Sequence, residues 1–366
     1  KQCAGMSVAI LVVQGKLSLD ADIRDYLKEV PEFGYTITVR HLLHHSSGIR
    51  DWVGLLWMSG QSMEDVISFD QIMQMVSNQK DLNFRPGDSE SYSNTGYNLL
   101  ARLVEEVTGE SFPDWTTKNI FQPLGMDNTY FPSHHGIVAA DRADSYSVDS
   151  DGGFKRVGNQ LTALGSSSLH STANDLLKWL RNFETAEVGG PQALDLMTQR
   201  YTLNNGEEIS YGFGLDFSPW QGQSLLSHSG SWAGFRAWIG YFPDARLGVV
   251  ALGNHENFSA RRAAYKIAQI ELELEPPVKD SEEAAKRAMD VVPELTSADL
   301  DEFVGSYRVE PFGVVVLVES DGKQLFMTAL GRQSLTPVST DSFISENSSS
   351  QQFTRDSQGA IAGGTF

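Results

Sequence analysis

Residues 3–13 are apolar or glycine except for Ser7, and Gly15 follows this segment. A segment that is apolar nearly all round and ends at a glycine is typical of a helix buried in the middle of a protein. A second segment, residues 97–107, carries apolar side chains at helical spacing and is followed by Gly109. This pattern predicts a helix that turns one face toward the core.

Strand patterns come later in the chain. The segments on both sides of residues 228–230 have strand patterns, so residues 224–241 are predicted to form two adjacent strands. Residues 247–254 predict a further strand, and residues 261–274 predict a helix after it. Helical segments in the first part of the chain and strands in the second indicate a mixed fold with a sheet and helices.

The last quarter of the chain has a different character. Residues 275–283 are polar and contain two prolines, which suits a linker. From about residue 298, short apolar segments alternate with turns such as residues 320–323, which predicts a β-rich region. We therefore divide the chain into a first domain of residues 1–276, a linker of residues 277–297 and a small β-rich domain of residues 298–366.

Composition narrows the choice of partners. The chain has 47 acidic and 28 basic residues, a net charge of −19. Nucleic acids and anionic membranes require clustered lysine and arginine, so we expect neither as a partner. The single cysteine, Cys3, excludes an intrachain disulfide and a C-x-x-C metal or redox site within these residues. No run of 18 apolar residues is present, so the sequence predicts no membrane-spanning segment.

Three short motifs occur in a set order. Lys1 directly precedes the apolar run, residues 92–94 read Tyr-Ser-Asn, and residues 228–230 read His-Ser-Gly. Three further segments lie between these motifs: residues 38–49 between the first and second, and residues 123–126 and 171–176 between the second and third. Over about residues 1–270 the chain resembles the serine β-lactamase-like and penicillin-binding-protein-like hydrolases. This family includes class C β-lactamases, DD-peptidases, D-aminopeptidases and family VIII esterases.

The resemblance implies an α/β fold of the α+β type. In this fold an antiparallel sheet is flanked by helices, an all-helical lobe lies beside it, and the active cleft lies between the two. Residues 303–307 resemble the opening of the small β-barrel-like domain that often follows such a hydrolase domain. The resemblance also implies a periplasmic or secreted protein without a metal or other cofactor. The sequence leaves the oligomeric state open.

The first two motifs imply a proton-transfer pair. Lys1 matches the lysine of the S-x-x-K motif, so we expect the nucleophilic serine three residues before Lys1, outside the printed sequence. A lysine one helical turn after a serine lies beside it, and desolvation lowers its pKa so that it can act as a base. By resemblance, Tyr92 moves a proton between nucleophile and leaving group, and Asn94 binds the substrate's amide carbonyl. Asn94 is equally suited to cap the helix that follows.

The third motif implies substrate binding on an edge strand. Gly230 lets a substrate backbone approach closely, and the N–H of Ser231 completes the oxyanion hole. His228 stands where β-lactamases have a lysine, and by resemblance it helps to hold the substrate. Because histidine only partly replaces a permanent cation near pH 7, this difference favours peptidase or esterase chemistry over β-lactam hydrolysis.

We therefore expect an enzyme, a serine hydrolase that forms an acyl-enzyme. Its substrates would be small molecules or peptides: D-amino-acid peptides and amides, or small esters, as in D-peptidases, carboxypeptidases and esterases. A first alternative is a non-catalytic module that binds a peptide or ester, which applies if the nucleophile is absent. A second alternative is a metal-dependent hydrolase, because His41 and His45 have the i, i+4 spacing of zinc ligands, with His44 beside them and His134 and His135 as further ligands.

Overall fold

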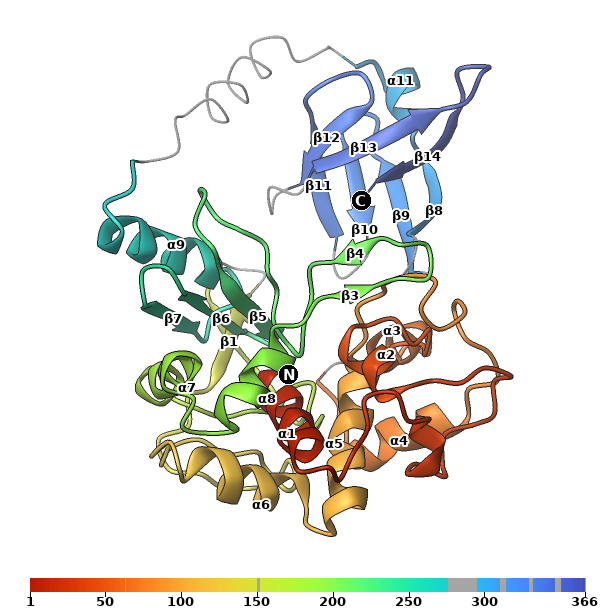
Figure 1. The fold of residues 1–366 in the computed structure, drawn as a ribbon. Helices are drawn as coiled ribbons and strands as arrows, with labels where there is room; N and C mark the ends of the chain where they lie inside the picture. Colours follow the sequence, from red (N-terminus) through yellow and green to blue (C-terminus); the bar gives the residue numbers. More distant parts are fainter. Residues whose placement is uncertain are drawn as a thin grey trace. The chain divides into compact units, whose positions relative to one another are not determined.

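The structure, a computed structural model, describes most of the chain with short gaps. The described residues are 1–62, 64–149, 152–275, 295–309, 314–328, 332–345 and 350–365. The chain divides into two compact units, Lys1–Leu274 and Glu275–Phe366, and Figure 1 labels most of their elements. Of the linker predicted at residues 277–297, the part up to residue 294 lies outside the described residues.

The first unit is mainly helical. Its α-helices are α1 (Gln2–Val13), α2 (Val39–Leu43), α3 (Trp52–Met58), α4 (Phe69–Ser77), α5 (Asn94–Thr108), α6 (Phe112–Thr116), α7 (Ala173–Thr185), α8 (Gly190–Met197) and α9 (Ala260–Glu271). A short 3-10 helix, η1 (Ile23–Asp25), and a π-helical turn, η2 (Thr117–Phe121), complete the set. Many of these helices start after a serine or threonine that accepts a backbone N–H: Thr38, Ser68, Ser93, Ser111, Thr172 and Ser259. No helix of the described residues is long and apolar enough to cross a membrane.

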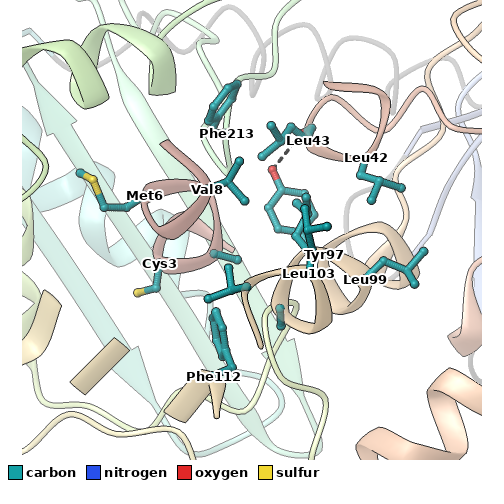
Figure 2. Close-up of a cluster of buried hydrophobic side chains, with 14 of the residues drawn as sticks. Cys3, Met6, Val8, Leu42, Leu43, Tyr97, Leu99, Leu103, Phe112 and Phe213 are labelled. Carbon is teal, nitrogen blue, oxygen red and sulfur yellow. Dashed lines mark hydrogen bonds between the residues drawn. The ribbon is translucent and has the colours of Figure 1, made fainter. Parts of the chain in front are cut away.

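Helix α1 lies inside the core of the first unit. Every residue from Gln2 to Leu11 is buried, so the buried helix predicted at residues 3–13 is confirmed. The helix packs against α5 and α8. Figure 2 shows side chains of α1 beside Tyr97 of α5, whose hydroxyl donates to the carbonyl oxygen of Leu43 at 2.8 Å. The lysine that precedes α1 is therefore attached to one of the most enclosed elements of the protein.

The strands of the first unit form small antiparallel sheets. The strands are β1 (Ser145–Val148), β2 (Phe154–Val157), β3 (Tyr201–Thr202), β4 (Glu208–Ile209), β5 (Leu226–Trp232), β6 (Phe235–Phe242) and β7 (Leu247–Gly253). β1 pairs with β2, β3 pairs with β4, and the remaining three form a sheet in the order β5-β6-β7. The strands predicted within residues 224–241 and 247–254, and the helix after them, are confirmed.

Helices cover both faces of the β5-β6-β7 sheet. On β6, Trp238 and Phe242 belong to one hydrophobic cluster with the buried alanines of α9. Tyr241, which points to the other face, stacks on Phe183 of α7 with ring centroids 6.1 Å apart. Alternate residues of a strand point to opposite faces, so α9 and α7 lie on opposite sides of this sheet. The predicted antiparallel sheet flanked by helices is therefore confirmed.

The second unit is a β structure with its own core. After the short helix α11 (Ser297–Asp301) come β8 (Gly305–Val309), β9 (Val314–Ser320), β10 (Leu325–Thr328), β11 (Arg332–Pro337), β12 (Ser342–Ser345), β13 (Ser350–Arg355) and β14 (Ile361–Thr365). Each strand pairs antiparallel with the next along the chain, and β14 returns to β8, which nearly closes a barrel. Phe303, Phe343 and Phe353 pack edge to face inside it. The predicted small β-barrel-like fold is confirmed.

Candidate active site

Lys1 lies against the segment that carries the Tyr-Ser-Asn motif. Its Nζ donates to Oδ1 of Asn94 at 2.8 Å and to the carbonyl oxygen of Ser166 at 3.0 Å. The same Nζ lies 4.8 Å from the ring centroid of Tyr92. The structure therefore brings together three of the predicted site residues from two distant parts of the chain.

A tight loop holds the start of α1 in place. Gly214 has φ +81°, and a Cβ at this position would lie 2.6 Å from the backbone N of Gln2 and 2.7 Å from the carbonyl carbon of Lys1. Gly5 meets the same loop one turn later, because a Cβ there would lie 2.3 Å from the carbonyl oxygen of Phe213. Only glycine permits this approach of two backbones, and the approach fixes the position of Lys1.

Helix α5 presents Asn94 to Lys1. The N-cap of α5 is Ser93, whose hydroxyl accepts the N–H of Gly96 at 3.3 Å. The alternative interpretation of Asn94 as the cap is therefore wrong: Asn94 is the first helical residue. A serine cap satisfies a free N–H of the first turn. The Asn94 side chain is consequently free to face the site.

Asp51, which the motifs do not include, supports this helix start. Its Oδ1 accepts the backbone N–H of Asn94 at 3.0 Å and that of Thr95 at 3.3 Å. Its Oδ2 accepts Nδ2 of the Asn94 side chain at 3.0 Å. A carboxylate at the N-terminus of a helix also interacts favourably with the helix dipole. One side chain therefore holds both the helix start and the amide that contacts Lys1.

Burial shifts the pKa of the Lys1 amine and of the Tyr92 hydroxyl in opposite directions. Desolvation lowers the pKa of the Lys1 amine to about 7, although the negative charge of Asp51 acts in the opposite direction. Burial, and then the Asp51 charge, raise the pKa of the Tyr92 hydroxyl. At neutral pH an appreciable share of Lys1 is therefore neutral and able to accept a proton, whereas Tyr92 keeps its proton and can donate it. Tyr92 is still 38% exposed, so the site is open at its ring.

His228 is held in one tautomer. Its Nδ1 lies 2.6 Å from the carbonyl oxygen of Ser229, which can only accept, so Nδ1 carries the proton. Its Nε2 therefore accepts the hydroxyl of Tyr211 at 2.9 Å. Burial, and then the charge of Lys1, lower the pKa of His228 to about 3. The ring lies beside Tyr92, with centroids 6.3 Å apart, and is neutral at pH 7.

Gly230 and Ser231 lie on the same strand, β5, at the edge of its sheet. At Ser227 this edge forms an isolated antiparallel bridge with Asp216, in which both backbone groups of Ser227 take part. Along a strand, alternate residues direct their backbone groups to the same edge. The N–H of Ser231 therefore points to the edge away from β6, as an oxyanion donor requires. Among the described residues, Lys1 forms no hydrogen bond with Gly230 or Ser231.

His45 lies beside the second motif, although the three motifs do not include it. Its carbonyl oxygen accepts the N–H of Ser91 at 2.8 Å, and its Nδ1 accepts the N–H of Ser93 at 3.1 Å. These two bonds flank Tyr92, and the His45 ring lies 4.4 Å from the Tyr92 ring between centroids. The ring is also 4.5 Å from that of Tyr211. His45 therefore supports the second motif from the side of α2.

The zinc-ligand spacing proposed for His41 and His45 is not formed. Helix α2 ends at Leu43, and His45 has φ 56°, so the two histidines do not share a helical face. His41 instead completes a capping box with Thr38. In the part of the chain that the structure describes, no group of three histidine, cysteine, aspartate or glutamate side chains is placed to hold a metal ion.

Known proteins are similar to this chain in sequence and in fold. A sequence model described as Beta-lactamase matches residues 1–272. Penicillin-binding protein 4* of Bacillus subtilis (strain 168) is 26% identical over 94% of this chain and 78% of its own length. A D-aminopeptidase of Gluconobacter oxydans is 26% identical over 65% of this chain, and the match spans only 45% of that enzyme.

A solved structure supports the fold over nearly the whole chain. The octameric penicillin-binding protein homologue from Pyrococcus abyssi aligns with a TM-score of 0.66, with 24% identity, over 97% of this chain and 82% of that one. At this identity the likeness concerns the fold alone. Because the family match covers residues 1–272, well over half of the 366 residues, the chain belongs to the beta-lactamase family, a family of serine hydrolases that includes penicillin-binding proteins and D-aminopeptidases.

Proposed function

We propose that the protein hydrolyses D-amino-acid amides or peptides, or small esters, through a covalent acyl-serine. The observation that carries this proposal is the partly buried Lys1 amine beside Tyr92 and Asn94, with a pKa lowered to about 7. A buried lysine that can lose its proton at neutral pH is suited to general-base catalysis. The D-aminopeptidases among the relatives support the choice of substrate class.

The proposed acylation step uses a serine three residues before Lys1. Lys1 takes the hydroxyl proton as the serine oxygen attacks the substrate carbonyl carbon, and the bond to the leaving group then breaks. Tyr92 gives its proton to the departing amine or alcohol and regains one from Lys1. The N–H groups of Ser231 and of the serine itself stabilise the oxyanion. Water then hydrolyses the acyl-serine by the same route.

The binding residues favour substrates without a carboxylate close to the scissile bond. His228 is neutral at pH 7, because burial and the Lys1 charge lower its pKa to about 3, so it offers no cation to such a group. Asn94 uses one hydrogen of Nδ2 for Asp51, and the second remains for a substrate carbonyl. Gly230 allows the substrate chain to lie against β5. These features support aminopeptidase, amidase or esterase chemistry over carboxypeptidase or β-lactamase chemistry.

The first prediction tests the acyl-enzyme. A protein with a serine three residues before Lys1 should gain the mass of one acyl group when mixed with an activated ester, and it should cleave D-alanine p-nitroanilide. Tyr92→Phe removes only the phenolic hydroxyl, so kcat should fall by about 10²–10⁴-fold, the usual range for general acid–base catalysis. Intact-mass spectrometry and steady-state kinetics measure both effects.

The matched control is a Ser→Ala change at the nucleophile, which should remove the adduct and leave the fold intact. Full activity in Tyr92→Phe would contradict the role of Tyr92. Substrate binding without any adduct would instead support the non-catalytic module. Hydrolysis that a chelator abolishes would support the metal-dependent alternative.

A further inference from the structure

The carboxylate of Asp51 and the amine of Lys1 contact opposite ends of one amide. Asp51 accepts Nδ2 of Asn94 at 3.0 Å, and Lys1 Nζ donates to Oδ1 of the same side chain at 2.8 Å. A carboxylate only accepts hydrogen bonds, and an ammonium only donates them. Only one of the two orientations of the Asn94 amide therefore satisfies both neighbours.

Further bonds fix Asp51 itself. Its Oδ1 accepts the backbone N–H groups of Asn94 and Thr95 at the first turn of α5. The hydroxyl of Thr95 donates to the carbonyl oxygen of Arg50 at 3.0 Å and accepts the N–H of Trp52 at 2.8 Å. The backbone on both sides of Asp51 is thus tied to the residue that follows Asn94. The carboxylate cannot turn without breaking the start of α5.

We propose that Asp51 is a positioning residue, which orients the Asn94 amide with its oxygen toward Lys1 and favours the charged form of the Lys1 amine against the effect of burial. It acts on the reaction through these two residues and needs no contact with substrate. The sequence motifs do not include it, and nothing in the three-motif scheme requires a carboxylate at this place.

The surroundings of Lys1 show why the carboxylate matters. Five titratable side chains face the amine from separate elements: Asp51 before α3, Tyr92 before α5, Tyr97 on α5, His45 after α2 and His228 on β5. Burial keeps both tyrosines protonated and both histidines neutral at pH 7, because it raises the pKa of the former and lowers that of the latter. Burial raises the pKa of the Asp51 carboxyl, and its hydrogen bonds from Asn94 and Thr95 and the charge of Lys1 act in the opposite direction. When ionised, Asp51 is the one negative charge in this set.

The Asp51→Asn variant should lower the titration midpoint of the Lys1 amine through two effects that add. The negative charge is lost, and a donor replaces the oxygen that faced Nδ2 of Asn94. Two donors then oppose each other, so the Asn94 amide turns and presents its nitrogen to Lys1. Loss of a nearby opposite charge and loss of an acceptor both disfavour the charged amine, so its titration midpoint should fall by about 1 pH unit or more.

The test follows Lys1 directly, without relying on catalysis. In protein labelled with carbon-13 at lysine Cε, the Lys1 signal is the one that Lys1→Met removes, and its shift with pH gives the midpoint. The wild-type midpoint should lie near 7, which is the lowered pKa of this amine, and that of Asp51→Asn should be lower. Asp175→Asn is the matched control, because Asp175 is also buried and accepts the N–H of Asn128 at 2.8 Å outside the site.

The activity measurement rests on the proposed function. In Asp51→Asn the acidic limb of kcat/KM should move to lower pH with the Lys1 midpoint, and kcat should fall at the plateau. A variant that is only less stable would lose activity at every pH without moving the limb. If the wild type has no hydrolase activity, the proposed function fails, while the NMR titration still decides the role of Asp51.

A second variant keeps the proposal open to test if Asp51→Asn does not fold. Asn94→Ala preserves both backbone bonds to Asp51 and removes only the amide, so the Lys1 midpoint should also fall, by less than in Asp51→Asn. If Asp51→Asn folds, it decides the proposal: a Lys1 midpoint that does not fall would overturn it, and a lower midpoint, with Asp175→Asn unchanged, supports it. If Asp51→Asn does not fold, the midpoint of Asn94→Ala decides in the same way.

Discussion

At the scale of single residues, the main feature is the Lys1 amine, which burial makes less basic, so that an appreciable share of it is neutral at pH 7. Lys1 contacts Asn94 and the carbonyl oxygen of Ser166, and neither contact supplies a negative charge. Burial therefore outweighs the attraction of Asp51, and the pKa falls to about 7 instead of rising. Lysine in water would hold its proton at neutral pH.

A pH dependence follows from this value. A general base works without its proton, so kcat/KM of the wild type should rise with pH and level off above about 7, the lowered pKa of Lys1. Below the midpoint the rate should fall about tenfold per pH unit, because the neutral fraction of Lys1 falls by that factor. Steady-state kinetics with an uncharged ester isolate this titration. A limb near pH 4 would instead indicate a carboxylate base.

The motifs identified Lys1, Tyr92, Asn94 and His228, which the structure places close together. The motifs could not identify the residues that hold them. Asp51 and His45 act through hydrogen bonds to a segment more than 40 residues away, and no local spacing encodes such a contact. For His45 the available signal was its cluster with two other histidines. The i, i+4 spacing requires a helix that continues through His45, whereas α2 ends at Leu43.

At the scale of elements, local patterns predicted the helices at residues 3–13, 97–107 and 261–274 and the strands within residues 224–254. Residues 3–13 lie in α1, and the segments at residues 224–241 and 247–254 contain β5, β6 and β7. Alternation defines the two faces of a strand without knowledge of its neighbours. The contact between α1 and the loop at residues 212–214 was not predicted, because it depends on how two backbones approach each other.

This contact gives the next prediction. In Gly214→Ala the new Cβ would lie 2.6 Å from the backbone N of Gln2, so α1 or the loop must move and Lys1 must move with it. Gly206→Ala is the matched control, since Gly206 has φ +89° and no atom lies within 4 Å of its Cβ position. Both variants should lose about 1 kcal/mol of stability from the left-handed backbone. Only Gly214→Ala should lose more than this and also lose kcat; equal effects in thermal unfolding and kinetics would contradict the prediction.

At the scale of the whole molecule, the hydrophobic cores follow the two units. The clusters around α1 and around α9 contain only residues of Lys1–Leu274. The cluster around Phe303 draws all its residues from Glu275–Phe366. We propose that these units correspond to a catalytic domain of residues 1–276 and a β-rich domain of residues 298–366. A change of pattern along the sequence suggested this division, because a separate core needs its own complete set of apolar positions.

The last prediction concerns the independence of the first unit. A chain that ends at Leu274 should fold, because none of the buried apolar residues in its clusters is removed, and burial of apolar surface is the main favourable term in folding. Calorimetry of the full chain should then show two transitions, of which the shorter chain retains one at an unchanged midpoint. The shorter chain should also keep the near-ultraviolet circular dichroism of packed aromatic residues. A single cooperative transition in the full chain, together with a shorter chain that lacks this signal, would mean that the first unit needs the second in order to fold.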